Sequence, residues 1–109
     1  MVIVVGVVEG RGETMHDLLE ISLEHVRRSR EEDGCIEHTV QIDYENPLRV
    51  RFFERWRDLA ALATHFAQPE SKMFSQRMAV LSAKPPAMSI YLAEEKSVAD
   101  ILAQIGKGK

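Results

Sequence analysis

Two residues on neighbouring apolar runs have the types needed for proton transfer. Glu54 lies between Phe52 and Trp56 in an alternating run, so all three side chains share one face of a strand. A buried carboxylate needs a partner or loses its charge. His38 lies on the matching face of the preceding run, and a histidine near neutral pKa suits proton abstraction. We predict His38 as a general base oriented by Glu54; the alternative is a structural polar pair.

Further candidates follow on the next helical segment and beyond it. His65 lies at the edge of the stripe formed by Leu59, Leu62 and Phe66, where it could lean into a pocket as a second acid or base. The alternative is a half-exposed surface histidine. Five aromatic side chains could line an apolar cavity for a planar aromatic substrate, or could simply form core: Phe52, Trp56, Phe66, Phe74 and Tyr91.

The other reactive side chains do not form a recognisable motif. No His, Cys or acidic residues have the spacing of a metal site, and no glycine-rich loop suits a phosphate or a dinucleotide. His16 and His25 are expected to face solvent, and Cys35 to be a small buried hydrophobe. We therefore expect no metal and no cofactor.

The elements that must position these residues follow the order β-α-β-β-α-(α)-β. Apolar runs predict strands over 1–9, 35–43, 49–57 and 87–93. Helical spacing predicts helices beginning near Thr14, after Asp58, at Pro69 and near Val98. This order is typical of the α+β, ferredoxin-like split βαβ fold, with a four-stranded antiparallel sheet and helices on one face. We expect a domain over 1–95, a C-terminal amphipathic helix or tail over 96–109, and a homodimer that covers the open face of the sheet.

The predicted hairpin over 35–57 brings the proton-transfer pair together. A one-residue slip would send every side chain to the other face, so apolar residues must stay opposite apolar ones. A five-residue loop over 44–48 then gives the cross-strand pairs Asp43–Arg49, Gln41–Arg51, Glu37–Arg55, His38–Glu54 and Ile36–Trp56. The arginine-rich face of this hairpin is expected to be a polar dimer interface.

Length and charge limit the classes of protein. The chain has 109 residues, a net charge of -3 and one cysteine, so a single domain without an internal disulfide is expected. The acidic balance gives no reason to expect nucleic-acid binding. No apolar run is long enough to span a membrane, and 2–8 lacks the basic flank of a signal peptide. We expect a cytoplasmic protein.

The segment from Phe53 to Phe74 has the pattern F-E-R-W-x-D-x-x-A-L-x-x-H-x-x-x-P-x-x-x-x-F. It resembles the antibiotic biosynthesis monooxygenase family of dimeric α+β barrels, as does the E-D-G-C-I entry to the second strand at 32–36. The resemblance covers about 1–93. It implies a range of activities: cofactor-independent quinol or anthrone monooxygenases, haem-degrading enzymes, and an isomerase of a phosphorylated autoinducer.

The departures from the family pattern narrow that range. His38 stands where many members have Tyr. The haem-degrading members use an Asn on the first strand and a His on a later helix, whereas this chain has Gly6 and no His over 73–77. The resemblance therefore favours a small monooxygenase without metal or flavin, in which a base deprotonates a quinol or anthrone and the anion reduces dioxygen. The alternatives are a proton-transfer isomerase of a small carbonyl metabolite and a non-catalytic ligand-binding or stress-response dimer.

Overall fold

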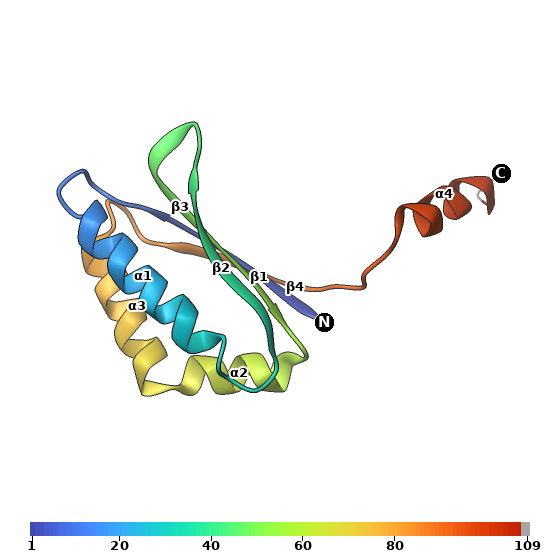
Figure 1. The fold of residues 1–109 in the computed structure, drawn as a ribbon, viewed down its shortest axis with the longest axis horizontal. Coiled ribbons are helices and arrows are strands. Elements are labelled where there is room, and N and C mark those ends of the chain that lie inside the picture. The colour runs from blue at the N-terminus through green and yellow to red at the C-terminus, as the bar shows by residue number, and fades with distance from the viewer. Residues whose placement is uncertain (108–109) are drawn as a thin grey trace.

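A four-stranded antiparallel sheet carries three helices on one face, and a fourth helix lies beyond it (Figure 1). This computed structural model describes residues 1–107. The elements are β1 (Val2–Glu9), α1 (Met15–Ser29), β2 (Cys35–Asp43), β3 (Asn46–Trp56), α2 (Leu59–Ala67), α3 (Pro69–Leu81), β4 (Ala87–Leu92) and α4 (Val98–Lys107). The strand order β2-β3-β1-β4 confirms the predicted ferredoxin-like arrangement.

The centre of the β2–β3 hairpin has the predicted register, but both of its ends differ. His38 pairs with Glu54, and Arg55 Nε donates to Glu37 at 2.6 Å on the opposite face. At the turn, the backbone of Asp43 pairs with Asn46 instead of Arg49. The predicted ion pair still forms, with Arg49 Nη1 3.5 Å from Asp43 Oδ2. The Asp43 side chain accepts a hydrogen bond from the backbone of Glu45 at 2.8 Å, which closes a tighter turn than the predicted five-residue loop.

At the other end of the hairpin, Cys35 rather than Ile36 pairs with Trp56, because an irregularity lies between Cys35 and Glu37. The first strand, β1, is covered unequally on its two faces. Its residues alternate between buried and half-buried, so only the face toward the helices is fully covered.

The core consists of two apolar clusters on the helix side of the sheet. One includes Phe52 and the other includes Trp56. Glu54 lies between these two aromatics on the same face of β3 and is 4% exposed. The fold therefore places a carboxylate in the gap between two hydrophobic clusters.

Two local features fix α2 against the hairpin. Asp58 caps α2, because its Oδ1 accepts a hydrogen bond from the backbone of Ala61 at 2.8 Å. Gly34 leads into β2 with φ of 85°, and a Cβ there would lie 2.5 Å from the Cβ of Ala61. Only glycine fits both the backbone conformation and the close approach of α2.

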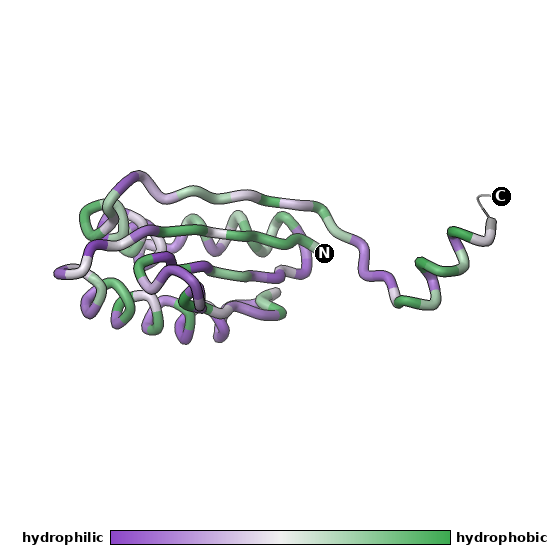
Figure 2. The backbone as a smooth tube through the Cα atoms, turned by 90° about the horizontal axis from the view of Figure 1, so that it is seen from above, coloured by the Kyte–Doolittle hydropathy of each residue, from purple (hydrophilic) through white to green (hydrophobic). Residues whose placement is uncertain are grey.

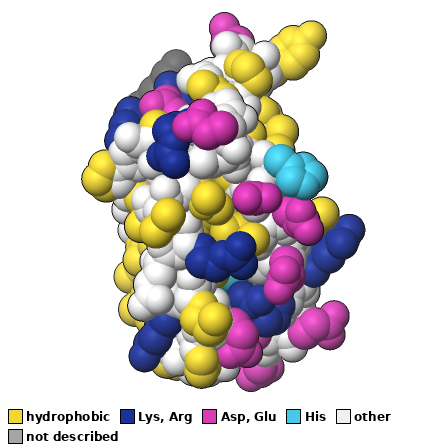
Figure 3. All heavy atoms as spheres, turned by 90° about the vertical axis from the view of Figure 1, so that its left-hand side faces the viewer, with side chains coloured by type: hydrophobic (Ala, Val, Ile, Leu, Met, Phe, Trp, Pro, Cys, Tyr) yellow, Lys and Arg dark blue, Asp and Glu magenta, His cyan; other side chains and the backbone are white. Residues whose placement is uncertain are grey.

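The helix α4 lies away from the sheet at the end of an extended segment (Figures 1 and 2). The predicted boundary after residue 95 falls in this segment, and residues 108 and 109 of the predicted tail lie outside the described residues. None of the helices within 1–107 combines the length and apolar character that a bilayer crossing demands. Acidic, basic and hydrophobic side chains are interspersed on the face shown in Figure 3.

Candidate functional site

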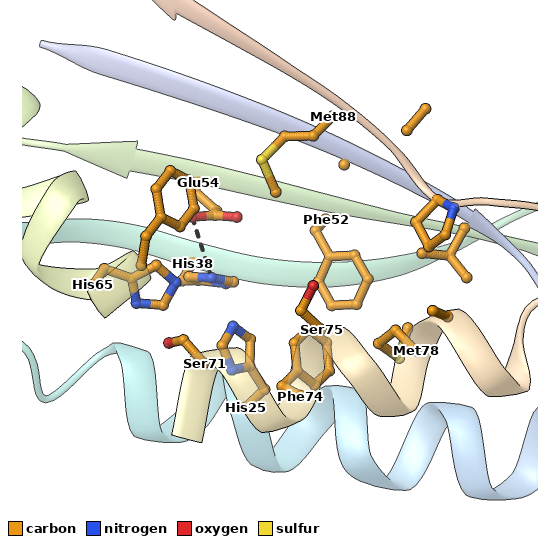
Figure 4. Close-up of a pocket in the computed structure, with 16 residues that line it drawn as sticks. His25, His38, Phe52, Glu54, His65, Ser71, Phe74, Ser75, Met78 and Met88 are labelled. Carbon is orange, nitrogen blue, oxygen red and sulfur yellow. Dashed lines mark ion pairs between the residues drawn. The ribbon is translucent and has the colours of Figure 1, made fainter. Parts of the chain in front are cut away.

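A cavity of about 310 Å³ lies between the sheet and the helices. Its lining is polar at one end and apolar at the other (Figure 4). The polar end contains His25, His38, Glu54 and His65. The apolar end contains Phe52, Phe74, Met78 and Met88. A small, mainly apolar cavity with a few convergent polar groups is typical of a ligand site.

The His38–Glu54 pair lies at the centre of the polar end. His38 Nε2 is 3.4 Å from Glu54 Oε1, and the side chains are 0% and 5% exposed. This distance is within the range of an ion pair but is longer than that of a good hydrogen bond. Glu54 Oε1 instead accepts a hydrogen bond from Trp56 Nε1 at 2.8 Å. The predicted pair is therefore brought together, with Trp56 fixing the carboxylate.

The protonation chemistry of this pair reverses the predicted roles. Burial, with smaller contributions from His65 and Arg30, lowers the pKa of His38 to about 3. Burial raises the pKa of Glu54 to about 7, against the opposing effect of the Trp56 hydrogen bond. Desolvation disfavours whichever form of each group is charged. Glu54, rather than His38, is thus the group suited to exchange protons near neutral pH, and His38 is a neutral neighbour.

His65 reaches the cavity from α2 and is not the half-exposed surface histidine of the alternative interpretation. It is only 2% exposed, and its ring stacks at an angle on Trp56 with centroids 4.6 Å apart. Its Nδ1 lies 2.9 Å from Glu32 Oε1 and 3.2 Å from Oε2. A carboxylate at Nδ1 fixes the proton there, so Nε2 is left with a lone pair.

His25 is the residue that sequence reasoning placed wrongly. It was expected at the surface, yet it is 5% exposed and stacks on Phe74 with ring centroids 3.9 Å apart. It lies seven residues after Leu18 and three after Ser22, both fully buried. That helical spacing carries the signal that could have identified it. His16, on another face of the same helix, is exposed as predicted.

The aromatic candidates divide between the cavity and other places. Phe52, Phe66 and Phe74 line the cavity. Trp56 does not: it is fully buried behind Glu54. Tyr91 is 53% exposed and pairs with Ile3, on the sheet face away from the helices. Neither of these last two residues forms the predicted cavity wall.

Several lining residues carried no sequence signal. The hydroxyl of Ser71 is buried without a hydrogen-bond partner among the described residues, and Met88 reaches the cavity from β4. The spacing of residues along α3 does not show which of its side chains face β4 across the cavity, because β4 is a separate element later in the sequence. Cys35 is partly buried, and burial raises the pKa of its thiol to about 11, which makes it a poor nucleophile.

Comparison with known proteins agrees with the fold. A family model described as antibiotic biosynthesis monooxygenase matches residues 1–77. A curated relative, uncharacterized protein sll1783 of Synechocystis, is 31% identical over 94 residues, which are 86% of this chain. The chain spans 64% of the length of that relative.

Solved structures share the arrangement over most of the chain. A candidate antibiotic biosynthesis monooxygenase from Deinococcus radiodurans has a TM-score of 0.85 at 27% identity, covering 89% of this chain and 96% of that one. Rv0793 from Mycobacterium tuberculosis has a TM-score of 0.82 at 21% identity, covering 88% and 97%. At 21% identity, the similarity to Rv0793 shows a shared fold only.

Proposed function

The chain belongs to the antibiotic biosynthesis monooxygenase family, and from that premise we propose that it oxidises a small quinol, anthrone or related aromatic substrate with dioxygen. One observation carries the proposal. Glu54 is a buried carboxylate in a cavity whose remaining wall is largely apolar and aromatic. A base held in a dry cavity beside a flat apolar surface suits deprotonation of a phenol or an activated CH₂ group.

The reaction begins when Glu54 removes a proton from the substrate, and the electron pair remains on the substrate anion. The anion passes one electron to dioxygen, and the two radicals combine to form a carbon–oxygen bond. The protonated Glu54 returns its proton to the distal peroxide oxygen. The remaining C–H bond and the O–O bond then break, so that an activated CH₂ becomes C=O and water leaves. The oxidant is dioxygen and the substrate supplies every electron, so this sequence requires no flavin.

The neighbours of Glu54 have supporting roles in this proposal. Trp56 holds one carboxylate oxygen at 2.8 Å and so fixes where the base points. His38 and His65 present imidazole nitrogen atoms to a substrate oxygen, which orients the substrate. The apolar end, with Phe52 and Phe74, stacks on the ring of the substrate.

The test is oxygen consumption with a panel of naphthoquinols and anthrones. In Glu54→Gln the rate is expected to fall by about 10²- to 10⁴-fold, because the base is lost while the shape is kept. Glu37→Gln is the matched control, since Glu37 lies one residue from His38 on the opposite face of the hairpin and pairs with Arg55. Equal rates in the wild type and Glu54→Gln would refute the assignment of the base.

The isomerase alternative uses the same carboxylate without oxygen chemistry. Deuterium exchange at a substrate carbon under anaerobic conditions, lost in Glu54→Gln, would accompany either reaction. Oxygen uptake in air assigns the monooxygenase. Exchange without uptake, across the whole panel, assigns the isomerase and overturns the proposal.

A further inference from the structure

Three histidines from distant parts of the sequence meet at the polar end of the cavity. His25 comes from α1, His38 from β2 and His65 from α2. All three are buried, and one ligand nitrogen from each lies within 4.8 Å of the others. Their ring centroids are 5.3, 5.4 and 5.8 Å apart. We infer that this cluster binds one divalent transition-metal ion of the class that prefers imidazole ligands, such as zinc, copper or iron.

The second observation that points to a ligand is His38. Neither of its ring nitrogens has a hydrogen-bond partner among residues 1–107, although the residue is only 1% exposed. Buried polar groups in folded proteins are nearly always partnered, and each exception needs an explanation. A metal ion coordinated by the imidazole supplies the missing partner.

Two acidic residues, Glu32 and Glu54, lie beside the histidines, where carboxylates commonly support metal ligands. Glu32 accepts from His65 Nδ1 at 2.9 Å and leaves Nε2 free to coordinate. This carboxylate–histidine–metal order is the usual outer support of a histidine ligand. Glu54 Oε1 lies 3.4 Å from His38 Nε2 and adds negative charge beside the site. Both acidic side chains lie where they favour a bound cation.

Arg28 opposes binding and makes the inference testable. Its Nη2 donates to His25 Nδ1 at 2.9 Å, so the proton of the neutral ring sits on Nε2 in the metal-free chain. Coordination through Nε2 requires that proton to move to Nδ1 and the guanidinium to turn away. Arg28 is only partly buried, so solvent can receive it. Removal of Arg28 should therefore strengthen metal binding.

The geometry also selects the kind of ion. Tetrahedral coordination at about 2.0–2.1 Å brings nitrogen ligands to about 3.3 Å from one another, a modest closure for side chains on three elements. Three protein ligands leave a fourth position, open to the cavity, for water or a substrate oxygen. Magnesium and calcium require oxygen ligands and are not expected to bind. Sequence spacing could not predict this site, because its ligands share no local motif.

The proton transfer assigned to Glu54 does not require this ion, so the inference goes beyond the proposed function. Metal binding is measured directly, whereas oxygen consumption is measured on chelator-treated protein. If metal binding is not observed, the proposed oxidation is unaffected, and if oxygen consumption is not observed, the inferred metal site is unaffected.

The first experiment titrates the chelator-treated full chain with Zn²⁺ in a calorimeter and records pulsed EPR of the Cu²⁺-loaded chain. We expect one ion per chain, coupling to three imidazoles, and no heat with Mg²⁺. The exposed group of His16, Asp17 and Glu20 is the competing site, and it offers a single imidazole. A one-imidazole spectrum that disappears in His16→Ala, or the absence of stoichiometric binding, would overturn the inference.

The second experiment uses variants whose folding is verified by circular dichroism. His65→Ala and His38→Gln should abolish stoichiometric binding, and His16→Ala should leave it unchanged. Glu32→Gln should weaken binding by about 10- to 100-fold, because it removes the outer support of His65. Arg28→Met should tighten binding by about tenfold. Equal affinity in Glu32→Gln, Arg28→Met and the wild type would contradict the assigned geometry, even if a cluster variant failed to fold.

Discussion

At the scale of single residues, burial decides the chemistry of the cavity. Glu54 and His38 share nearly the same environment, yet their pKa values move in opposite directions, because desolvation favours the neutral form of each. At neutral pH the pair therefore consists of a half-ionised carboxylate and a neutral imidazole. Ionisation of the buried Glu54 therefore destabilises the folded protein.

Glu54→Gln should make the protein more stable at alkaline pH. The folded-state pKa of Glu54 is about 7, raised from 4.5, so its contribution is fully present below pH 4.5 and is lost as pH rises through 7. Glutamine does not ionise and keeps the oxygen that Trp56 contacts. In chelator-treated protein we expect the variant to gain about 1–3 kcal/mol at pH 8 and little at pH 4. Urea unfolding at both pH values measures this, and Glu37→Gln should show no such gain.

The buried histidines should destabilise the fold in acid. Burial lowers the pKa of His25 and His38 from 6.5 to about 3. Their contribution is therefore present above pH 6.5 and is lost as pH falls toward 3, at up to about 1.4 kcal/mol per pH unit for each histidine. His25→Leu should flatten the dependence of unfolding free energy on pH between 6.5 and 4.5. His16→Leu, at an exposed position on the same helix, should leave the slope unchanged; identical slopes in all three proteins would contradict the assignment.

At the scale of elements, the cavity depends on how α2 leaves the hairpin. Asp58 caps the helix directly after β3, and His65 lies two turns further on. The same helix contacts the loop at Gly34, which holds it against the start of β2. The position of His65 therefore depends on one capping carboxylate and one glycine.

Asp58→Ala should loosen α2 and lower the stability of the protein, because the backbone amide of Ala61 loses its acceptor. Asp58→Asn is the control, since asparagine caps helices about as well as aspartate. Thermal unfolding should place Asp58→Asn near the wild type and Asp58→Ala below it. Equal losses in both variants would show instead that the ion pair with Arg57 is what stabilises this position.

Sequence reasoning succeeded where alternation alone decides the structure. The His38–Glu54 pairing followed from alternation on two adjacent strands and is confirmed. It missed the burial of His25, although the helical spacing from Leu18 and Ser22 indicates it. The stacking of His25 on Phe74 had no sequence signal, because it joins two helices that share no pattern. Both faces of β4 are apolar in sequence, so the side that Tyr91 takes follows only from its pairing with Ile3. The pKa shifts of Glu54 and His38 could not be predicted either, because they depend on desolvation rather than on spacing.

At the scale of the whole molecule, the sheet edge and the last helix carry exposed apolar surfaces. Every residue of β4 is exposed, including Ile90 and Leu92. The apolar stripe of α4 is also exposed and consists of Val98, Ile101, Leu102 and Ile105. Contiguous apolar surface of this kind marks an interface. We propose that two copies associate through the sheet and that α4 of each packs on the other.

Charge placed on the apolar stripe of α4 should weaken the dimer. In Ile101→Glu/Leu102→Glu we expect the dimer dissociation constant to rise at least about tenfold, since each buried aliphatic side chain contributes about 1.5–3 kcal/mol. Ala103→Glu is the matched control, because position 103 lies on the opposite face of the same helix. Sedimentation velocity over a range of concentrations measures the constant. A monomeric wild type would refute the dimer. A double variant that dimerises as tightly as the wild type would show that α4 lies outside the interface.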